Sequence, residues 1–156
     1  MQRDQFEIDV RGVEWVDTDG EPRKPVAVVA FHGSRDDLRN RLTGTAGETL
    51  SADQTDVSFR FVSDSEDAAA TGVVAVTNRL TGDFVLETNA AASDVLDFVR
   101  AARRYGEAAG DDGRYRITIT TDGEELASYE KSTLLVYTDE GELLRNRSLI
   151  PSGVEL

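Results

Sequence analysis

The only histidine in the chain, His32, is the first candidate for chemistry. It follows an apolar run that predicts a strand, and Asp36 and Asp37 come shortly after it. An imidazole beside carboxylates can act as a general base or as a metal ligand. A lone histidine at a strand end is more often an exposed residue without a special task, and we favour that reading. A Ser-His-Asp triad would need this histidine, and the G-x-S-x-G motif that presents such a serine is absent.

Seven arginines are the second candidate, because their spacing places them on shared faces of predicted elements. Three recur on a predicted helix, and two lie on each of two predicted strands: Arg100, Arg103, Arg104, Arg114, Arg116, Arg145 and Arg147. If these faces converge in the fold, they form a positive surface on an acidic protein. Such a surface would suit nucleic acid or an acidic protein segment.

Two considerations make nucleic acid the less favoured ligand of these arginines. Phosphate contacts lose affinity steeply as the salt concentration rises, and the composition predicts a salt-rich cell. The aromatic residues nearest to them, Tyr105 and Tyr115, occupy predicted core positions and are poorly placed to stack on bases. We therefore favour the alternative in which the arginines form ion pairs within the chain, with Glu107, Asp111, Asp112 and Glu142.

The remaining motifs do not support a cofactor or a metal. The glycine-containing stretch 42–48 lacks the G-K-[ST] ending of a phosphate-binding loop. The acidic turn 17–20 lacks the later ligands of a calcium loop. The absence of cysteine excludes disulfides, thiolate catalysis and cysteine-ligated metals. We predict no cofactor, while paired carboxylates leave an enzyme possible in principle.

The charge balance predicts a protein adapted to concentrated salt. The chain has 30 acidic and 17 basic residues, a net charge of -13. Self-repulsion at this charge disfavours a compact fold in dilute buffer, whereas at molar salt the screening length falls to about 3 Å. Only Lys24 and Lys131 are lysines; the other basic residues are arginines, which pair with carboxylates in bidentate fashion. This composition is typical of a halophile cytosol.

Length and hydropathy predict a cytoplasmic protein with a single domain, residues 1–156. The first ten residues contain Asp4, Glu7 and Asp9 and lack the basic and apolar regions of a signal peptide. No apolar run approaches the ~18 residues of a membrane span, so we expect no membrane partner. A chain of 156 residues has the size of one ordinary domain.

Hydrophobic periodicity predicts an α+β fold, a mostly antiparallel β-sheet with two helices packed on it. The expected order is β-β-α-β-β-β-α-β-β-β-β, and its two similar halves suggest a weak internal duplication. Helices are expected from Ser34 and from Ser93, each acting as an N-cap. Strands are expected at 6–15 with a bulge at Gly12, and at 25–30, 57–61, 73–78, 84–88, 115–119, 126–130, 134–137 and 143–149.

Two apolar features at the ends of the chain complete the prediction. Trp15 is expected to anchor the core beneath the first strands. The C-terminal segment 149–156 keeps four apolar residues where most chains fray. We favour docking of this segment on its own sheet, with binding of a partner as the alternative.

Four segments carry a resemblance to a known family: FEIDVRGVEW, TGVVAVTNRLTGDFVLE, DDGRYRITI and SLIPSGVEL. They resemble short acidic proteins of halophilic archaea that form a domain of unknown function. The likeness covers nearly the whole chain, which implies a haloarchaeal source and a complete single domain. It implies no catalytic or binding residues.

The leading functional prediction is a non-enzymatic accessory protein that binds another protein, or itself, through an exposed sheet face or edge. It follows from the small catalytic inventory of one histidine and no cysteine. The alternatives are a nucleic-acid-associated protein that uses the arginine faces, and an enzyme based on carboxylates.

Overall fold

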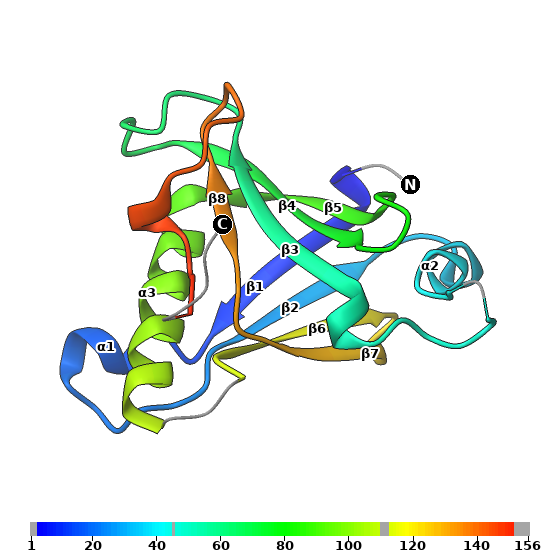
Figure 1. The fold of residues 1–156 in the computed structure, drawn as a ribbon, viewed down its shortest axis with the longest axis horizontal. Helices are drawn as coiled ribbons and strands as arrows, with labels where there is room; N and C mark the ends of the chain where they lie inside the picture. Colours follow the sequence, from blue (N-terminus) through cyan, green and yellow to red (C-terminus); the bar gives the residue numbers. More distant parts are fainter. Residues whose placement is uncertain (1–2, 45, 110–112, 152–156) are drawn as a thin grey trace.

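A computed structural model describes residues 3–44, 46–109 and 113–151, which form two four-stranded sheets (Figure 1). The first sheet has the order β1-β2-β6-β7, with strands Phe6–Arg11, Val26–Phe31, Tyr115–Thr121 and Glu124–Lys131. The second has the order β5-β4-β3-β8, with strands Phe84–Ala91, Thr71–Asn78, Thr55–Phe61 and Leu135–Tyr137. The predicted α+β class is confirmed.

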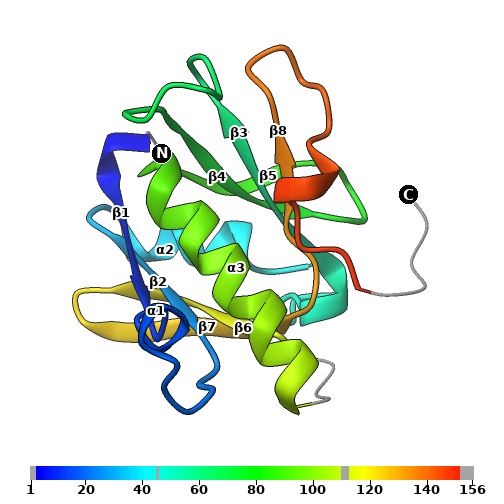
Figure 2. The same cartoon turned by 90° about the vertical axis from the view of Figure 1, so that its left-hand side faces the viewer.

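Three α-helices and three short 3-10 helices accompany the sheets in the described residues. The α-helices are α1 (Trp15–Thr18), α2 (Arg35–Arg41) and α3 (Ala92–Ala109); the 3-10 helices are η1 (Arg3–Gln5), η2 (Ala52–Gln54) and η3 (Arg145–Arg147). The long helix α3 lies across one side of the molecule and packs against β1 and β5 (Figure 2). None of the described helices has the length and apolar character needed to cross a membrane.

Strand pairing is mostly antiparallel, as predicted, with one parallel pair in each sheet. The antiparallel pairs are β1–β2, β3–β4, β4–β5 and β6–β7. The parallel pairs are β2–β6 and β3–β8. The β6–β7 turn is formed by Asp122 and Gly123, both with positive φ (51° and 79°). This backbone suits the twist of a tight hairpin, which is why an Asp-Gly pair predicts one.

The two sheets and α3 share one hydrophobic core. Alternating residues of each strand face inwards, and β4 is buried on both faces over its central residues, as its unbroken apolar run predicts. Helix α3 contributes Val95, Phe98, Val99 and Ala102, at the helical spacing that identifies its inner face. A smaller cluster of Trp15, Val16 and Ala101 fixes α1 against α3, so the expected burial of Trp15 is confirmed.

The expected continuation of the first strand to Trp15 is wrong. Strand β1 ends at Arg11, and Gly12 adopts a φ of +75°, which turns the chain away from the sheet. The Trp15 indole Nε1 donates a hydrogen bond to the Gly12 carbonyl oxygen at 2.6 Å, and the ring packs on α3. Burial of this large side chain therefore favours a short helix over a longer strand.

The expected last strand at 143–149 is also wrong, because its segment meets β8 through isolated bridges and a side-chain contact in place of a continuous ladder. Leu134 and Leu149 exchange two backbone hydrogen bonds of 3.0 and 2.8 Å, and η3 lies between the two contact points. The Ser148 hydroxyl accepts the Val136 N–H at 2.8 Å and donates to the Leu144 carbonyl. A side chain thus replaces a ladder partner along the three-residue strand β8.

The helix caps and the proposed duplication give mixed outcomes. Ser34 caps α2 as expected, by accepting the Asp37 N–H, but α3 begins at Ala92, so Ser93 lies inside its first turn. The strand order does not repeat between the sheets. In the first sheet β6 pairs with β2, the later strand of the β1–β2 pair, whereas in the second sheet β3 pairs with β4, the earlier strand of the β4–β5 hairpin. At the C-terminus Leu149 is fully buried, whereas residues 152–156 lie outside the described residues.

Replacing Gly72 in β4 provides a test of the close packing between β4 and β3 in the second sheet. A Cβ atom at this position would collide with the Arg60 carbonyl oxygen and the Phe59 ring, and the backbone carbonyl cannot move without distorting β3. Gly72→Ala is therefore expected to lower the free energy of unfolding by about 1–3 kcal/mol, measured by chemical denaturation. The exposed neighbour provides the control, because Thr71→Ala should change it by no more than about 0.5 kcal/mol. Equal stability of the two variants would contradict this packing.

Candidate functional site

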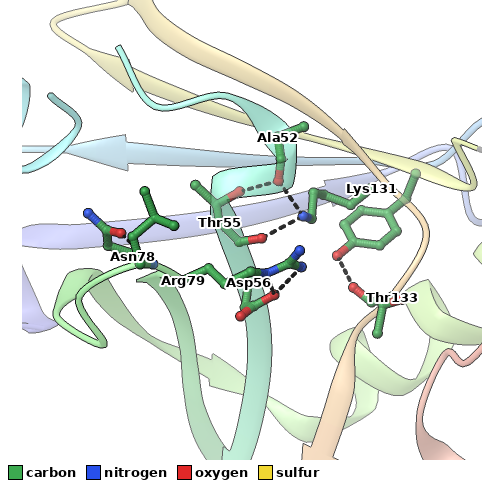
Figure 3. A network of polar contacts seen from close by, with 9 residues as sticks. Ala52, Thr55, Asp56, Asn78, Arg79, Lys131 and Thr133 are labelled. Carbon is green, nitrogen blue, oxygen red and sulfur yellow. Dashed lines mark hydrogen bonds and ion pairs between the residues drawn. The ribbon is translucent and has the colours of Figure 1, made fainter. Parts of the chain in front are cut away.

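A groove opens where the chain leaves the first sheet at the end of β7 and crosses to β8 in the second sheet. Its volume is about 680 Å³. Its walls come from η2, β3, the end of β4, the end of β7 and β8. Figure 3 shows the polar side chains gathered there, with Lys131 at the centre.

Lys131 reaches this position because it occupies an inward-facing place on an edge strand. Ala127, Tyr129 and Lys131 alternate along β7, and all three are buried. The Lys131 ammonium donates hydrogen bonds of 2.6 Å to the Ala52 and Thr55 carbonyl oxygens (Figure 3). The two carbonyls belong to η2 and to the start of β3. One side chain of the first sheet therefore satisfies backbone acceptors of the second.

The electrostatics of Lys131 reflect its burial. Removal from water lowers the pKa of Lys131 below its usual 10.5, and the positive charge of Arg79 lowers it further. The carboxylates of Asp56 and Asp53 act in the opposite direction. An ammonium group offers three donors and no acceptor, so a pair of carbonyl oxygens is the partner set that suits the protonated form.

Three further charged groups line the groove beside Lys131. Arg79 binds one Asp56 carboxylate oxygen through two guanidinium nitrogens, at 3.0 and 2.6 Å. Asp53 accepts a hydrogen bond from the Ser51 hydroxyl, which is the main reason that the pKa of Asp53 lies below its usual value. Because Ser51 and Gln54 form a capping box around η2, this turn is fixed where it meets Lys131.

Glu130 links the groove to the outer face of the first sheet. It accepts from Lys24 at 2.9 Å and from two nitrogens of Arg116, at 2.8 and 2.5 Å. The Lys24 ammonium also lies 5.6 Å from the centre of the Tyr105 ring. Both lysines of the chain therefore make contacts at the last two residues of β7.

Apolar residues also line the groove. Val57, Leu135 and Tyr137 line it, and Tyr115 lies behind it in the core. The buried Tyr115 hydroxyl donates to the Thr133 carbonyl at 2.7 Å and so holds the crossover between β7 and β8. Burial raises the pKa of Tyr115, so the hydroxyl stays protonated and remains a donor.

This arrangement favours binding over chemistry. Lys131, Asp56, Arg79 and Glu130 are each engaged with a partner in the chain, and the half-buried side chains of Leu135 and Tyr137 line the groove beside them. Protein interfaces have this anatomy. In the part of the chain that the structure describes, no three His, Asp or Glu side chains converge as a set that could hold a metal ion.

The helix arginines singled out by the sequence contact α1 and the segment around η3. Arg100 pairs with Asp17 at 3.0 Å and with Asp97 at 3.5 Å. Arg104 donates to the Val16 carbonyl oxygen and lies over the Trp15 ring. Arg103 donates to the Ser148 carbonyl oxygen at 2.8 Å, which brings it beside the segment that carries Arg145 and Arg147.

Arg114 and Arg116, expected on one face of a strand, do not join that group. Arg114 lies against Gly106 at the end of α3, where an added Cβ atom would approach its Nε to 2.8 Å. Arg116 is on the outer face of β6, paired with Glu130. Arg147 donates to the Ser65 carbonyl oxygen and pairs with Glu66 at 3.3 Å.

Ion pairing within the chain was expected. Among the described residues, the carboxylates of Asp17, Asp19, Asp97, Glu66 and Glu130 contact Arg100, Arg104, Arg147 and Arg116. Asp111 and Asp112 lie outside the described residues.

His32 is an exposed residue that follows β2. Its Nε2 lies 3.3 Å from the Glu7 carboxylate of β1, and the side chain is 57% exposed. Asp36 and Asp37, the carboxylates expected beside His32, lie on the first turn of α2, and this contact is made with Glu7 instead. The structure places His32 away from the groove and on the opposite end of the first sheet from Lys131.

Sequence reasoning did not single out Lys131, although two signals were present. It continues the inward alternation of Ala127 and Tyr129, where an apolar residue is the rule. It is also one of only two lysines in the chain. A charged residue that points inward from an edge strand is a known means of protecting that edge from further pairing.

Replacing Lys131 should destabilise the contact between the sheets. Lys131→Met keeps the length of the side chain but leaves the Ala52 and Thr55 carbonyl oxygens without their donor. We expect the free energy of unfolding to fall by about 2–3 kcal/mol, measured by denaturation at fixed salt. The matched control is Lys24→Met, whose half-buried ion pair with Glu130 leaves no backbone carbonyl without its donor and should contribute roughly 1 kcal/mol or less. A larger loss for Lys24→Met than for Lys131→Met would refute the bridging role.

Glu130 should make the stability of the protein sensitive to acid. Burial raises the pKa of Glu130, but the hydrogen bonds from Lys24 and Arg116 outweigh it and leave the pKa below 4.5. The Glu130 carboxylate therefore contributes its full stabilisation at a pH above 4.5, the pKa of the unfolded state. This stabilisation is lost as the pH falls through the lower pKa of Glu130 in the folded protein.

Between neutral pH and about pH 3, the wild-type protein should lose more unfolding free energy than Glu130→Gln. Denaturation curves across this range at constant salt provide the measurement. Glu125→Gln, an exposed carboxylate on the same strand, is the control and should follow the wild type. Curves for Glu130→Gln that run parallel to the wild type would show that the carboxylate has no such role.

Comparison with known proteins places the whole chain in one family. No curated protein and no solved structure matches it. A family model matches residues 1–156, and its description is a family of unknown function (DUF5793). The resemblance noted in the four sequence segments is thereby confirmed at the level of the family. The chain belongs to the DUF5793 family.

Proposed function

We propose that this protein is a non-enzymatic accessory protein that binds an extended segment of another protein in the groove between β3, β7 and β8. One observation carries the proposal: the charged side chains of the groove are paired within the chain, while Val57, Leu135 and Tyr137 line an open cavity. Such a surface gains free energy by covering its apolar residues and needs no rearrangement of its charges.

The charge of the protein supports an apolar mode of binding. At a net charge of -13, we propose that the chain works in the cytoplasm of a salt-adapted cell. Exposed charges there interact over only about 3 Å, so ion pairs at a rim contribute little to affinity. Burial of apolar area does not depend on that screening and remains effective in salt.

Nucleic acid is the weaker candidate on the same grounds. The arginines expected to bind phosphates make contacts within the chain, such as Arg100 with Asp17 and Arg147 with Glu66. A phosphate would have to compete with these carboxylates, and it would do so in salt that opposes phosphate binding.

Filling the groove should abolish partner binding. Ser58 lies on the groove wall, so Ser58→Arg places a long side chain across the cavity. Affinity capture from a salt-adapted host, in about 1 M KCl with and without nuclease, should recover a stoichiometric protein with the wild type and lose it with Ser58→Arg. Thr71→Arg, on an exposed part of the same sheet, is the matched control and should retain the partner.

Three results would contradict the proposal. Recovery that disappears on nuclease treatment would favour the arginine faces and nucleic acid. Equal recovery with Ser58→Arg and the wild type would place the partner elsewhere on the surface. Absence of any stoichiometric protein would reopen the alternative of a carboxylate-based enzyme.

A further inference from the structure

The tip of the β4–β5 hairpin exposes two large apolar side chains. Leu80 is 69% exposed and Phe84 is 53% exposed. Among the described residues, Val62 is the other large hydrophobic residue with this exposure. Two such residues four positions apart on one hairpin stand out in a chain with a net charge of -13.

A second groove lies directly beside this apolar pair. Its volume is about 580 Å³, and it separates the hairpin from the end of α2, which lies next to β5 (Figure 1). Phe84 and Val85 line one side, and Thr43 and Gly44 line the other. The hairpin thus offers a projecting side chain, Leu80, next to a recess with an aromatic wall.

The same groove carries one charge of each sign. Arg41 and Asp83 both line it, and both are exposed. Neither side chain has an ion-pair partner within the described ranges, in contrast to the nearby pair of Arg79 and Asp56. The surface therefore combines two exposed apolar side chains, Leu80 and Phe84, with a cation and an anion at a groove whose other lining residues are mostly polar. The apolar side chains can cover one another across a contact, and the two charges complement each other.

We propose that this surface binds a second copy of the same chain about a two-fold axis. Leu80 of each copy enters the groove beside Phe84 of the other, and Arg41 of each copy pairs with Asp83 of the other. A two-fold contact uses the same patch on both subunits, so it requires a patch that is complementary to itself. The proposal uses a different surface from the groove at Lys131 and does not depend on the function proposed for it.

The high net charge sets the conditions for this contact. Two copies at -13 each repel one another in dilute salt. At molar salt the repulsion is screened beyond about 3 Å, while the apolar contact and a direct Arg–carboxylate pair remain. Dimers are therefore expected at molar salt.

The first experiment measures mass in solution. In about 1 M KCl, analytical ultracentrifugation of the wild type should show dimers, and the variant with both Leu80→Ser and Phe84→Ser should be monomeric. Val62→Ser removes an exposed apolar residue elsewhere and should remain dimeric, as should Ser58→Arg. Circular dichroism checks that each variant is folded. A monomeric wild type, or a dimer that survives the double substitution, would overturn the proposal.

The second experiment tests the orientation by exchange of charges. Arg41→Glu alone places two carboxylates together at each end of the contact, and Asp83→Arg alone places two guanidinium groups together. Each variant by itself should dimerise roughly tenfold or more weakly than the wild type. An equimolar mixture restores opposite charges at both ends, so heterodimers should form with nearly wild-type affinity. Failure of the mixture to recover dimers would refute the two-fold arrangement.

Discussion

The contact of Lys131 with the Ala52 and Thr55 carbonyl oxygens holds together a fold whose two sheets separate at this point. The chain passes from β7 to β8 and so from one sheet to the other. On the side away from β4, the start of β3 has no strand beside it, because β8 pairs with β3 only from Ser58 onwards. An ammonium group supplies the donors that a neighbouring strand would otherwise provide. The Lys131 side chain takes the place of a neighbouring strand and covers less of β3 than a strand would. The uncovered part of β3 forms a wall of the groove.

Much of the fold could be predicted because local patterns and tertiary structure agree. Three local patterns each indicate a single type of structure. Alternating residues indicate the strands β3 and β6, the Asp122-Gly123 pair indicates a hairpin turn, and the apolar stripe of α3 indicates a helix. The errors arose where a distant contact overrode the local pattern. Trp15 left the first sheet to pack on α3, and Ser148 used its hydroxyl in place of a strand partner for Val136.

The candidate site was harder to predict, because it depends on residues that meet only in the folded chain. Spacing correctly grouped Arg100, Arg103 and Arg104 on one helix, but no sequence pattern indicates that Arg100 contacts Asp17. Lys131 is different, since its inward position on β7 could be read from the alternation alone. Its partners are backbone carbonyls, which every residue possesses, and this is why its role needed the structure.

The parallel pairs have a consequence for how fast the chain folds. Val26 pairs with Arg116, and Ser58 pairs with Leu135, so each sheet joins strands from distant parts of the sequence. Such contacts close long loops and give a high contact order, which is typical of folding in milliseconds to seconds. Until β6 and β8 arrive, the edges of β2 and β3 are open to other molecules. In dilute salt the mutual repulsion of acidic chains protects the unfinished protein from aggregation, but molar salt screens that repulsion and leaves these open edges without such protection.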